Sequence, residues 1–435
     1  MNTVYGRWTK ERGFTLLTLS ILTPVLFILG GSLIVFSLTE VRATHRSQMG
    51  TQAFYLAESA VDSGYRWLQD QGGPPGGTEA LVLDGGWQEM GLGEYLVVVD
   101  PDDGNPLDYV KRYAIQGWGV MDDGSAARRT TMLVQVESFA RYAYFTNNEI
   151  SSSNQIVWFT SWDHITGPAH TNGQFSMWGS PTFDGFVSSV SSSINYYNPP
   201  PAGGNNPHFN QGYELGSDVK PYPTSIPTTL INAANTAGMV FTGDTTVTLV
   251  SDGTMRVTNT NAGLSNAVVS LPDNGVLYVQ NGNVNLSGTL QGQLTVATNQ
   301  NIRITNSVVY SDDPQVDPDS QDLLGILAGG NVVVASSAPN NIRIDASVMA
   351  LNTSFTVENW WQGPAKGTLT LVGGITQSKR GPVGSFNAST GTFVSGYKKD
   401  YRYDERLRNM IPPYFPLTGD YVILGWEEEL DAPSE

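Results

Sequence analysis

The chain has 435 residues, a formal net charge of −17 and no cysteine, which excludes disulfides, thiolate catalysis and Cys-based zinc or iron–sulfur sites. Gly and Pro contribute 47 and 24 residues and hydrophobic residues 40%, a composition typical of folded, turn-rich domains. The excess of acidic residues argues against nucleic acid as a partner, because affinity for phosphates comes from clustered Lys and Arg. We therefore expect neither DNA nor RNA binding.

The N-terminal segment predicts a membrane anchor. Residues 1–12 form a basic leader, and residues 13–38 carry no charge. As a helix, this uncharged run would be about 39 Å long, enough to cross a bilayer with some tilt. A cleaved secretory signal is the alternative, but its apolar region is shorter, about 7–15 residues. We predict a retained transmembrane helix in the bacterial inner membrane, with the N-terminus in the cytoplasm and the polar body outside.

The start of this helix resembles a known processing site. The run Lys10-Glu11-Arg12-Gly13-Phe14, followed by apolar residues, is similar to the cleavage site of type IV prepilins. In that family a dedicated peptidase cuts after the glycine and methylates the new N-terminal residue, usually phenylalanine. The resemblance therefore implies processing between Gly13 and Phe14. Pilins typically have Glu at the fifth mature position, where this chain has Thr18, and this difference favours a minor pilin over a bulk fibre subunit.

Residues 39–71 predict an amphipathic helix that extends the anchor. Counting from Ala53, apolar or small residues recur at helical spacing as far as Leu68. The block from Ala53 to Ala60 resembles the segment behind the membrane span of PilX-type pilus-assembly proteins. Pro24 and the Gly30-Gly31 pair are residues that can kink or locally melt the membrane helix, and a tolerated membrane-helix proline is the alternative.

Beyond the helix the hydrophobic period changes to two. Residues 95–99, 109–120 and 129–136 alternate in polarity and are separated by Asp- and Gly-rich turns, which predicts three strands. A long helix followed by a small antiparallel sheet is the order of a pilin head. We predict a small pilin-like β domain over 72–140.

Residues 141–435 are rich in Gly and Asn and contain internal repeats. The segment 301–308 recurs at 341–348 with six of eight residues identical, and 276–284 and 324–332 share an apolar run that ends in Gly-Asn-Val. Short aliphatic strands with Gly or Asn at corners favour a β-solenoid whose coils stack aligned side chains. A β-sandwich of similar hairpins is the alternative. The predicted fold class is mainly β with a long N-terminal α-helix.

Three further segments of this body have distinct sequences. Residues 191–227 are Pro-rich and predict an insertion that covers the body, and residues 396–435 predict a C-terminal cap. The motif over 165–187 resembles an uncharacterised extracytoplasmic domain found behind PilX-type N-termini in some bacterial proteins. That resemblance gives organisation and no activity.

The best cluster of catalytic residue types is Asp163, His164, His170 and Asp184. The two histidines are separated by a Gly-Pro turn, and no third residue has metal-ligand spacing, so we interpret them as residues that brace a turn. Neither a Gly-x-Ser-x-Gly elbow nor a phosphate-binding Gly-Lys-Ser/Thr loop is present. The sequence predicts no catalytic residue, no cofactor and no enzymatic activity.

An acidic loop offers the one candidate calcium site. Its carboxylates supply hard oxygen ligands but lack the regular spacing of a calcium loop, so a solvated insertion is favoured; they are Asp312, Asp313, Asp317, Asp319 and Asp322.

Exposed aromatic residues could contact sugars or other surfaces, because indole rings bury a large area at low entropy cost. The candidates are Trp158, Trp162 and Trp178 and the pair Trp360-Trp361, with core packing as the alternative. Adjacent strand residues face opposite sides of a sheet, so one ring of Trp360-Trp361 is expected at the surface. This pair is the predicted ligand contact.

These observations lead to one preferred function. We expect a non-enzymatic, membrane-anchored, PilX-like minor pilin or pilus-associated protein that contributes to type IV pilus assembly or to surface display and adhesion. Its expected partners are the inner membrane and other pilins, with surface glycans as a further candidate. The alternative is an anchored polysaccharide-binding or polysaccharide-degrading protein on a β-helix scaffold. A degrading enzyme would need facing carboxylates on one coil surface.

Overall fold

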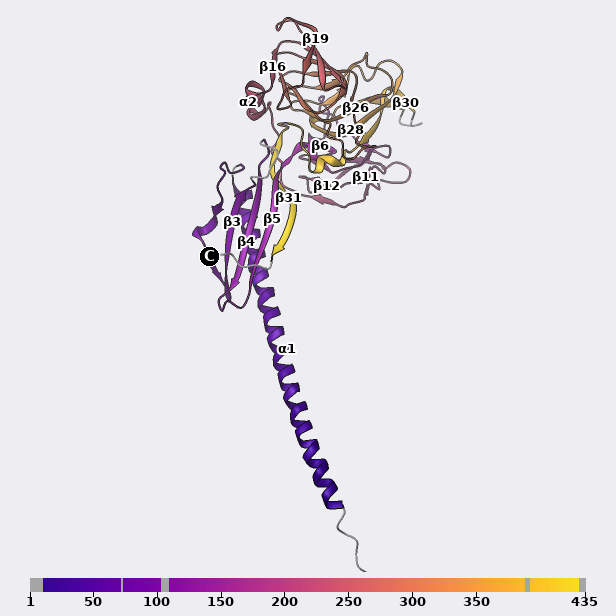
Figure 1. Ribbon diagram of the computed structural model, residues 1–435. Coiled ribbons are helices and arrows are strands. Elements are labelled where there is room, and N and C mark those ends of the chain that lie inside the picture. The colour runs from indigo at the N-terminus through magenta and orange to yellow at the C-terminus, as the bar shows by residue number, and fades with distance from the viewer. Residues whose placement is uncertain (1–10, 72, 103–108, 388–391, 430–435) are drawn as a thin grey trace, which may run out of the picture. The chain divides into compact units, whose positions relative to one another are not determined.

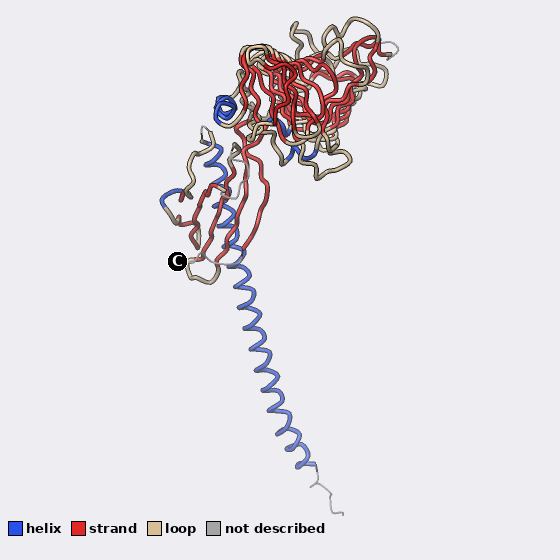
Figure 2. The backbone as a smooth tube through the Cα atoms, turned by 45° about the horizontal axis from the view of Figure 1, so that its top comes forward, coloured by secondary structure: helices blue, strands red, loops and turns tan. Residues whose placement is uncertain are grey.

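The computed structural model describes residues 11–71, 73–102, 109–387 and 392–429 (Figure 1). The chain forms two compact units. The first contains residues 1–104, 112–134 and 423–435, and the second contains 105–111 and 135–422. Outside one long helix, strands dominate both units (Figure 2). The mainly β fold with a long N-terminal helix is thus confirmed.

Helix α1 (Glu11–Asp70) is continuous through Pro24 and through the Gly30-Gly31 pair. The helix is therefore not broken at these positions, in line with a tolerated membrane-helix proline, because one missing N–H donor does not end a helix whose other bonds remain. The large apolar side chains from Leu16 to Val41 are exposed. Within the described residues this is the one helix long and apolar enough to cross a membrane.

The second half of α1 packs on a six-stranded sheet with the order β1-β3-β4-β5-β31, in which β2 also pairs with β3. The strands are β1 (Leu81–Val82), β2 (Gln88–Met90), β3 (Gly93–Pro101), β4 (Arg112–Met121), β5 (Ala127–Ser138) and β31 (Leu417–Glu429). The three predicted strands correspond to β3, β4 and β5. Ala53, Ala57 and Ala60 are fully buried on the helix face that meets the sheet, so the predicted amphipathic extension does pack by its small residues.

The sixth strand comes from the C-terminus. Arg129 pairs with Glu429 at 2.8 Å near one end of β5, whereas the Phe139 N–H donates to the Pro416 carbonyl at 3.1 Å just beyond its other end. These contacts make β31 antiparallel to β5. The segment 396–435 is therefore not one cap, since residues 417–429 complete the sheet that α1 covers.

The second unit begins as a stack of short coils. Its strands are β6 (Tyr144–Asn148), β7 (Phe159–Thr160), β8 (His164–Ile165), β9 (Ala169–Thr171), β10 (Ser176–Trp178), β11 (Thr182–Phe183), β12 (Val187–Ser189), β13 (Asn195–Tyr196), β14 (His208–Phe209) and β15 (Tyr213–Leu215). Every third strand pairs in parallel, so Tyr144, Ala169, Val187 and Tyr213 form one column. The Pro-rich stretch 191–227 thus contributes a third coil, because its prolines fall between strands of two or three residues.

After α2 (Thr228–Thr236), a second stack follows. Its strands are β16 (Met239–Thr242), β17 (Thr245–Val250), β18 (Thr254–Asn259), β19 (Leu264–Ser270), β20 (Val276–Gln280), β21 (Val284–Leu290), β22 (Gln293–Thr298), β23 (Ile302–Tyr310), β24 (Leu323–Ala328), β25 (Val332–Val334), β26 (Ile342–Ala350), β27 (Phe355–Val357), β28 (Ala365–Lys379), β29 (Gly384–Phe386) and β30 (Phe393–Arg402).

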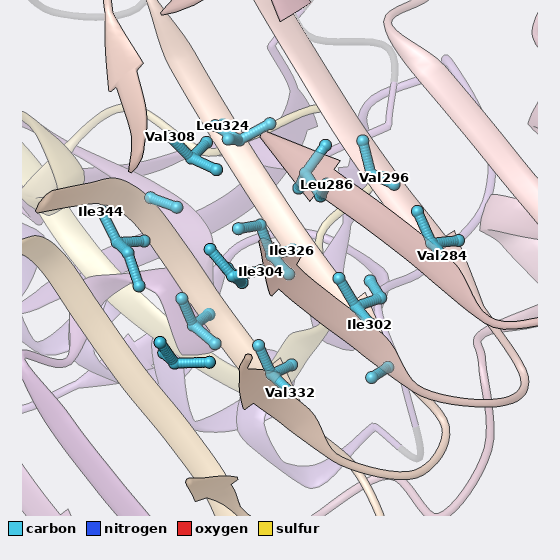
Figure 3. Packing of buried hydrophobic residues seen from close by; sticks show 14 of the residues in the cluster. Val284, Leu286, Val296, Ile302, Ile304, Val308, Leu324, Ile326, Val332 and Ile344 are labelled. Carbon is cyan, nitrogen blue, oxygen red and sulfur yellow. The ribbon is translucent and has the colours of Figure 1, made fainter. Parts of the chain in front are cut away.

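Aligned aliphatic side chains fill this second stack. Val284, Ile302 and Val332 pair in parallel from one coil to the next (Figure 3). Phe355 continues this column, and all four side chains are buried. Asparagines stack at the corners in the same way, and the Asn301 amide donates to the Asn283 side chain at 3.1 Å. Parallel pairing between successive coils is the pattern expected of a solenoid, whereas a sandwich is built from antiparallel sheets.

The two stacks meet at a junction that we call the seam. Strand β28 pairs in parallel with β26 on one side and with β6 on the other, which places Val348, Ile375 and Tyr144 in one column. The first coil strand of the second unit thus lies beside one of its last, as the ribbon shows (Figure 1). The chain winds through the first stack, passes α2 and winds through the second stack until β28 reaches β6.

The two sequence repeats differ in whether their copies occupy the same column of the stack. Val284 and Val332 occupy the same column, in agreement with the second repeat. The first repeat is not in register, because Ile302 pairs with Val332 while Ile342 pairs with Leu369. Its two copies therefore share an alternating pattern without sharing a position in the coil.

Candidate functional site

Two adjoining cavities open at the seam. Cavity A has a volume of about 340 Å³ and lies against β8, β28 and β30. Cavity B has a volume of about 420 Å³ and lies against the 157–163 segment, the 381–384 segment and β30. The two share four lining residues, which are Trp162, Asp163, Gly381 and Lys399. We call A and B the seam cavities.

A partly buried ion pair forms the shared wall. Lys399 Nζ donates to Asp163 Oδ1 at 2.8 Å, and the backbone N–H and hydroxyl of Thr160 donate to Oδ2 at 2.8 and 3.0 Å. Burial opposes the ionisation of Asp163, but the charges of Lys399 and Arg380 and these hydrogen bonds outweigh it and hold the pKa of Asp163 below its usual value. Asp163 is thus a fixed carboxylate at the wall.

A second charged pair supports cavity A. The Arg380 guanidinium lies 3.7 Å from the centre of the Phe159 ring, donates to the Val157 carbonyl at 2.9 Å and faces Glu149 at 3.5 Å. Burial raises the pKa of Glu149, and the charge of Arg380 acts against that rise. Since both side chains are almost fully buried, the pair fixes the floor of the cavity.

Aromatic rings line cavity B and continue beyond it. Trp158, Trp162, Phe393 and Tyr397 face the cavity. The Trp158 ring contacts Tyr197 at a centroid distance of 5.2 Å, and Tyr197 contacts Trp178 at 5.5 Å. We call Trp158, Tyr197 and Trp178 the aromatic strip.

The predicted cluster of Asp163, His164, His170 and Asp184 is divided among three environments. His164 pairs with Asp184 at 2.6 Å on the coil surface, while Asp163 pairs with Lys399 in the seam. The His170 ring is fully buried, with Nδ1 at 2.7 Å from Ser188 Oγ and Nε2 at 3.1 Å from Asn172 Oδ1. Burial lowers the pKa of His170 to about 4, so its ring is neutral near pH 7.

The acidic loop uses its carboxylates in local contacts. Asp322 accepts from the backbone N–H groups of Gly292 and Asp312, and Asp313 pairs with Arg343 at 2.7 Å. Asp317 accepts from the Asp319 N–H at 3.1 Å. Within the described ranges no group of three His, Asp or Glu side chains is placed to hold a metal ion.

The remaining predicted residues lie apart from the seam cavities. Trp361 is 58% exposed, whereas Trp360 packs against the core of the second stack, and their rings meet edge to face. Their role as a ligand contact stays a prediction. Gly13 and Phe14 are helical positions at the start of α1 whose side chains are not described, and residues 1–10 of the leader are outside the described residues.

Sequence reasoning missed Arg380, Lys399 and Glu149 as members of a site. Glu149 is an isolated charge, whereas Arg380 and Lys399 belong to short basic runs that carry no motif of a site. The fold brings Arg380 and Lys399 to Asp163 from more than 200 residues away. No local pattern contains that pairing.

A family model described as a domain of unknown function, DUF4900, matches residues 109–192, which run from the sheet of the first unit into the first stack. The crystal structure of the competence-associated pilin ComZ from Thermus thermophilus is similar, with a TM-score of 0.37 and 12% identity over 88% of this chain and 98% of that chain. No curated protein of known function matches the chain.

Proposed function

We propose that the chain is a non-enzymatic pilin-like protein that is anchored in the inner membrane by α1, carries its β-solenoid outside the membrane and acts in a type IV pilus system as a minor subunit. The observation that carries this proposal is the division of α1. Its first half exposes apolar residues, and its second half packs on an antiparallel sheet through Ala53, Ala57 and Ala60.

The exposed apolar side chains in the first half of α1 must be shielded from water. An apolar helix surface in water costs roughly 25 cal/mol per Å², so the stretch from Leu16 to Val41 needs lipid or other apolar helices around it. A lipid anchor and a helix bundle at a fibre centre both meet this need. The resemblance of the Gly13-Phe14 site to prepilin sites supports a chain whose helix moves from the lipid bilayer into a helix bundle at the centre of a fibre.

Two observations support a function without catalysis. Asp163 and Asp400 both line cavity A, but Asp163 pairs with Lys399 and Asp400 pairs with Arg402 at 2.8 Å. Glycoside hydrolysis requires one carboxylic acid that stays protonated near neutral pH, and the pKa of Asp163 is lowered. Asp163 is therefore not prepared as a general acid.

The test is to replace the glycine at the cleavage position in the native host. Gly13→Val should block processing, so the chain should keep Met1, remain with membranes and be missing from sheared surface material. Gly6→Val, a matched change inside the leader, should be processed and distributed as the wild type is. Recovery of shortened Gly13→Val protein in the sheared fraction at the wild-type level would contradict the proposal.

A further inference from the structure

We propose that the seam cavities bind a carboxylate-bearing polysaccharide, with one sugar ring held in cavity B against Trp162 and the polymer continuing over the aromatic strip. This inference concerns what the solenoid binds and does not depend on how α1 is processed. Cavity B, at about 420 Å³, is within the range of ligand pockets, which are roughly 300–1,000 Å³.

The placement of Trp162 suits a sugar ring. A pyranose presents an apolar C–H face and an edge of hydroxyl groups, so it needs a flat exposed ring beside polar groups. Trp162 is 54% exposed, although its backbone is fixed by the turn in which Asp163 N donates to the Thr160 carbonyl at 2.9 Å. The ring is therefore presented on a rigid support, which lowers the entropy lost on binding.

The shared wall supplies hydrogen bonds for the hydroxyl edge. The Asp163 carboxylate accepts and the Lys399 ammonium donates, and the two groups are joined at 2.8 Å. A neighbouring acceptor and donor match two adjacent hydroxyl groups of a sugar. The Lys399 side chain is still 34% exposed, so it can contact a ligand without breaking its pair.

The charged side chains that line cavity B indicate which substituent the bound sugar carries. Lys398 and Lys399 line it together with Asp163 as the single acidic residue among the lining residues, in a chain whose net charge is −17. Lys398 is exposed and forms no ion pair with any described residue. A carboxylate on the sugar would pair with this ammonium, whereas a neutral sugar would not.

The aromatic strip indicates a polymer. Phe159, Met177 and Tyr196 are parallel partners on three successive coils, and Trp158, Trp178 and Tyr197 are their sequence neighbours. The three rings therefore form one contiguous cluster across the three coils, with Tyr197 in contact with both tryptophans, and Tyr197 is 40% exposed. A single sugar would use one coil, but a chain of sugars can follow all three.

Single-stranded nucleic acid also stacks on aromatic rings beside Lys residues. The joined acceptor and donor of Asp163 and Lys399 match two adjacent hydroxyl groups, which a uronic acid ring has and single-stranded DNA lacks. The structure therefore favours the carboxylated polysaccharide, and nucleic acid is treated as an outcome of the test.

The experiment uses the full chain in detergent and measures binding to polygalacturonate oligomers by calorimetry. Binding is expected, and Trp162→Ala should weaken it by about tenfold or more. Lys398→Gln should weaken it several-fold and reduce its dependence on salt. Trp87→Ala is the matched control, an exposed tryptophan outside the seam cavities, and it should bind as the wild type does. Trp361→Ala tests the contact predicted from the sequence as an alternative site. Unchanged circular dichroism would show that the variants fold.

Four outcomes would overturn the proposal. These are no binding of polygalacturonate, equal binding by Trp162→Ala and wild type, loss of binding in Trp361→Ala alone, or tighter binding of neutral cello-oligosaccharides or single-stranded DNA than of polygalacturonate. None of these outcomes alters the expected processing at Gly13, so failure of this inference and failure of the proposed function are distinguishable.

Discussion

At the scale of single residues, the second unit keeps several polar groups buried by giving each a partner. Glu149 receives hydrogen bonds from Tyr144 and Thr146 and faces Arg380, while His170 bridges Ser188 and Asn172. An unpartnered buried charge costs several kcal/mol, so these contacts fix the positions of their side chains. The floor of the seam is rigid for this reason.

His170 gives the solenoid a defined response to acid. Its pKa is about 4 in the folded chain, because burial disfavours the charged ring, and about 6.5 when unfolded. The unfolded state therefore binds the proton first. The buried neutral ring of His170 therefore contributes fully to the free energy of unfolding above pH 6.5. As the pH falls towards 4, this contribution decreases by roughly 3 kcal/mol.

The measurement is urea unfolding of wild type and His170→Gln at several pH values. The free-energy difference between the two proteins should shrink by roughly 3 kcal/mol between pH 7 and pH 4. A difference that stays constant across this range would show that His170 is not buried as a neutral ring.

The sequence identified only part of the seam. Trp158, Trp162 and Asp163 were candidates because tryptophan and acidic residues near a turn are visible locally. Lys399 and Arg380 could not be connected to them, since the pairing depends on β28 meeting β6, and parallel neighbours carry no local signal of their register.

At the scale of elements, the contact between α1 and its sheet depends on small residues on both sides. A Cβ added at Gly119 would lie 2.1 Å from the Ala53 carbonyl oxygen, and one at Gly117 would lie 2.3 Å from that of Ala57. Real Cβ atoms do not come so close to backbone, so the helix must shift if either glycine is replaced. The glycines set the distance between helix and sheet.

Gly119→Ala should therefore loosen this contact at a cost of about 1–3 kcal/mol, the usual range for overpacking. Hydrogen exchange of residues 53–60 should become faster. Gly76→Ala is the control, because a Cβ there meets open space, and its exchange should match the wild type. Equal exchange rates in all three proteins would contradict the packing described for α1 and β4.

The period of hydrophobic residues was sufficient to predict α1, β3 to β5 and the repeated strands of the solenoid. It could not place β31, whose partner β5 lies about 300 residues earlier, as the pairing of Arg129 with Glu429 shows. The prediction of a covering insertion over 191–227 was wrong, because strands of two or three residues are too short to show a hydrophobic period.

At the scale of the whole molecule, the coils are an insertion between two neighbouring strands. The Phe139 N–H donates to the Pro416 carbonyl at 3.1 Å, so the chain leaves β5 and returns to β31 at nearly the same point. An insertion with adjacent ends can be removed without stretching the sheet that holds it.

Replacing residues 139–416 by an Asn-Gly turn should leave a folded helix-and-sheet protein, because the turn links two antiparallel neighbours. Circular dichroism and cooperative thermal unfolding would measure this. A second variant that also lacks residues 417–429 should be less stable and prone to aggregation, since β5 would become an open edge. If the first variant is unfolded, the sheet depends on the coils, and the insertion described here is wrong.

The most direct test of the account is the N-terminus of the native protein. Intact mass and N-terminal sequence would be measured separately for the membrane fraction and for sheared surface material. We predict a chain in the sheared fraction that begins at a methylated Phe14. A chain that keeps Met1 and occurs only in membranes would contradict the pilin-like function and leave α1 as a simple anchor.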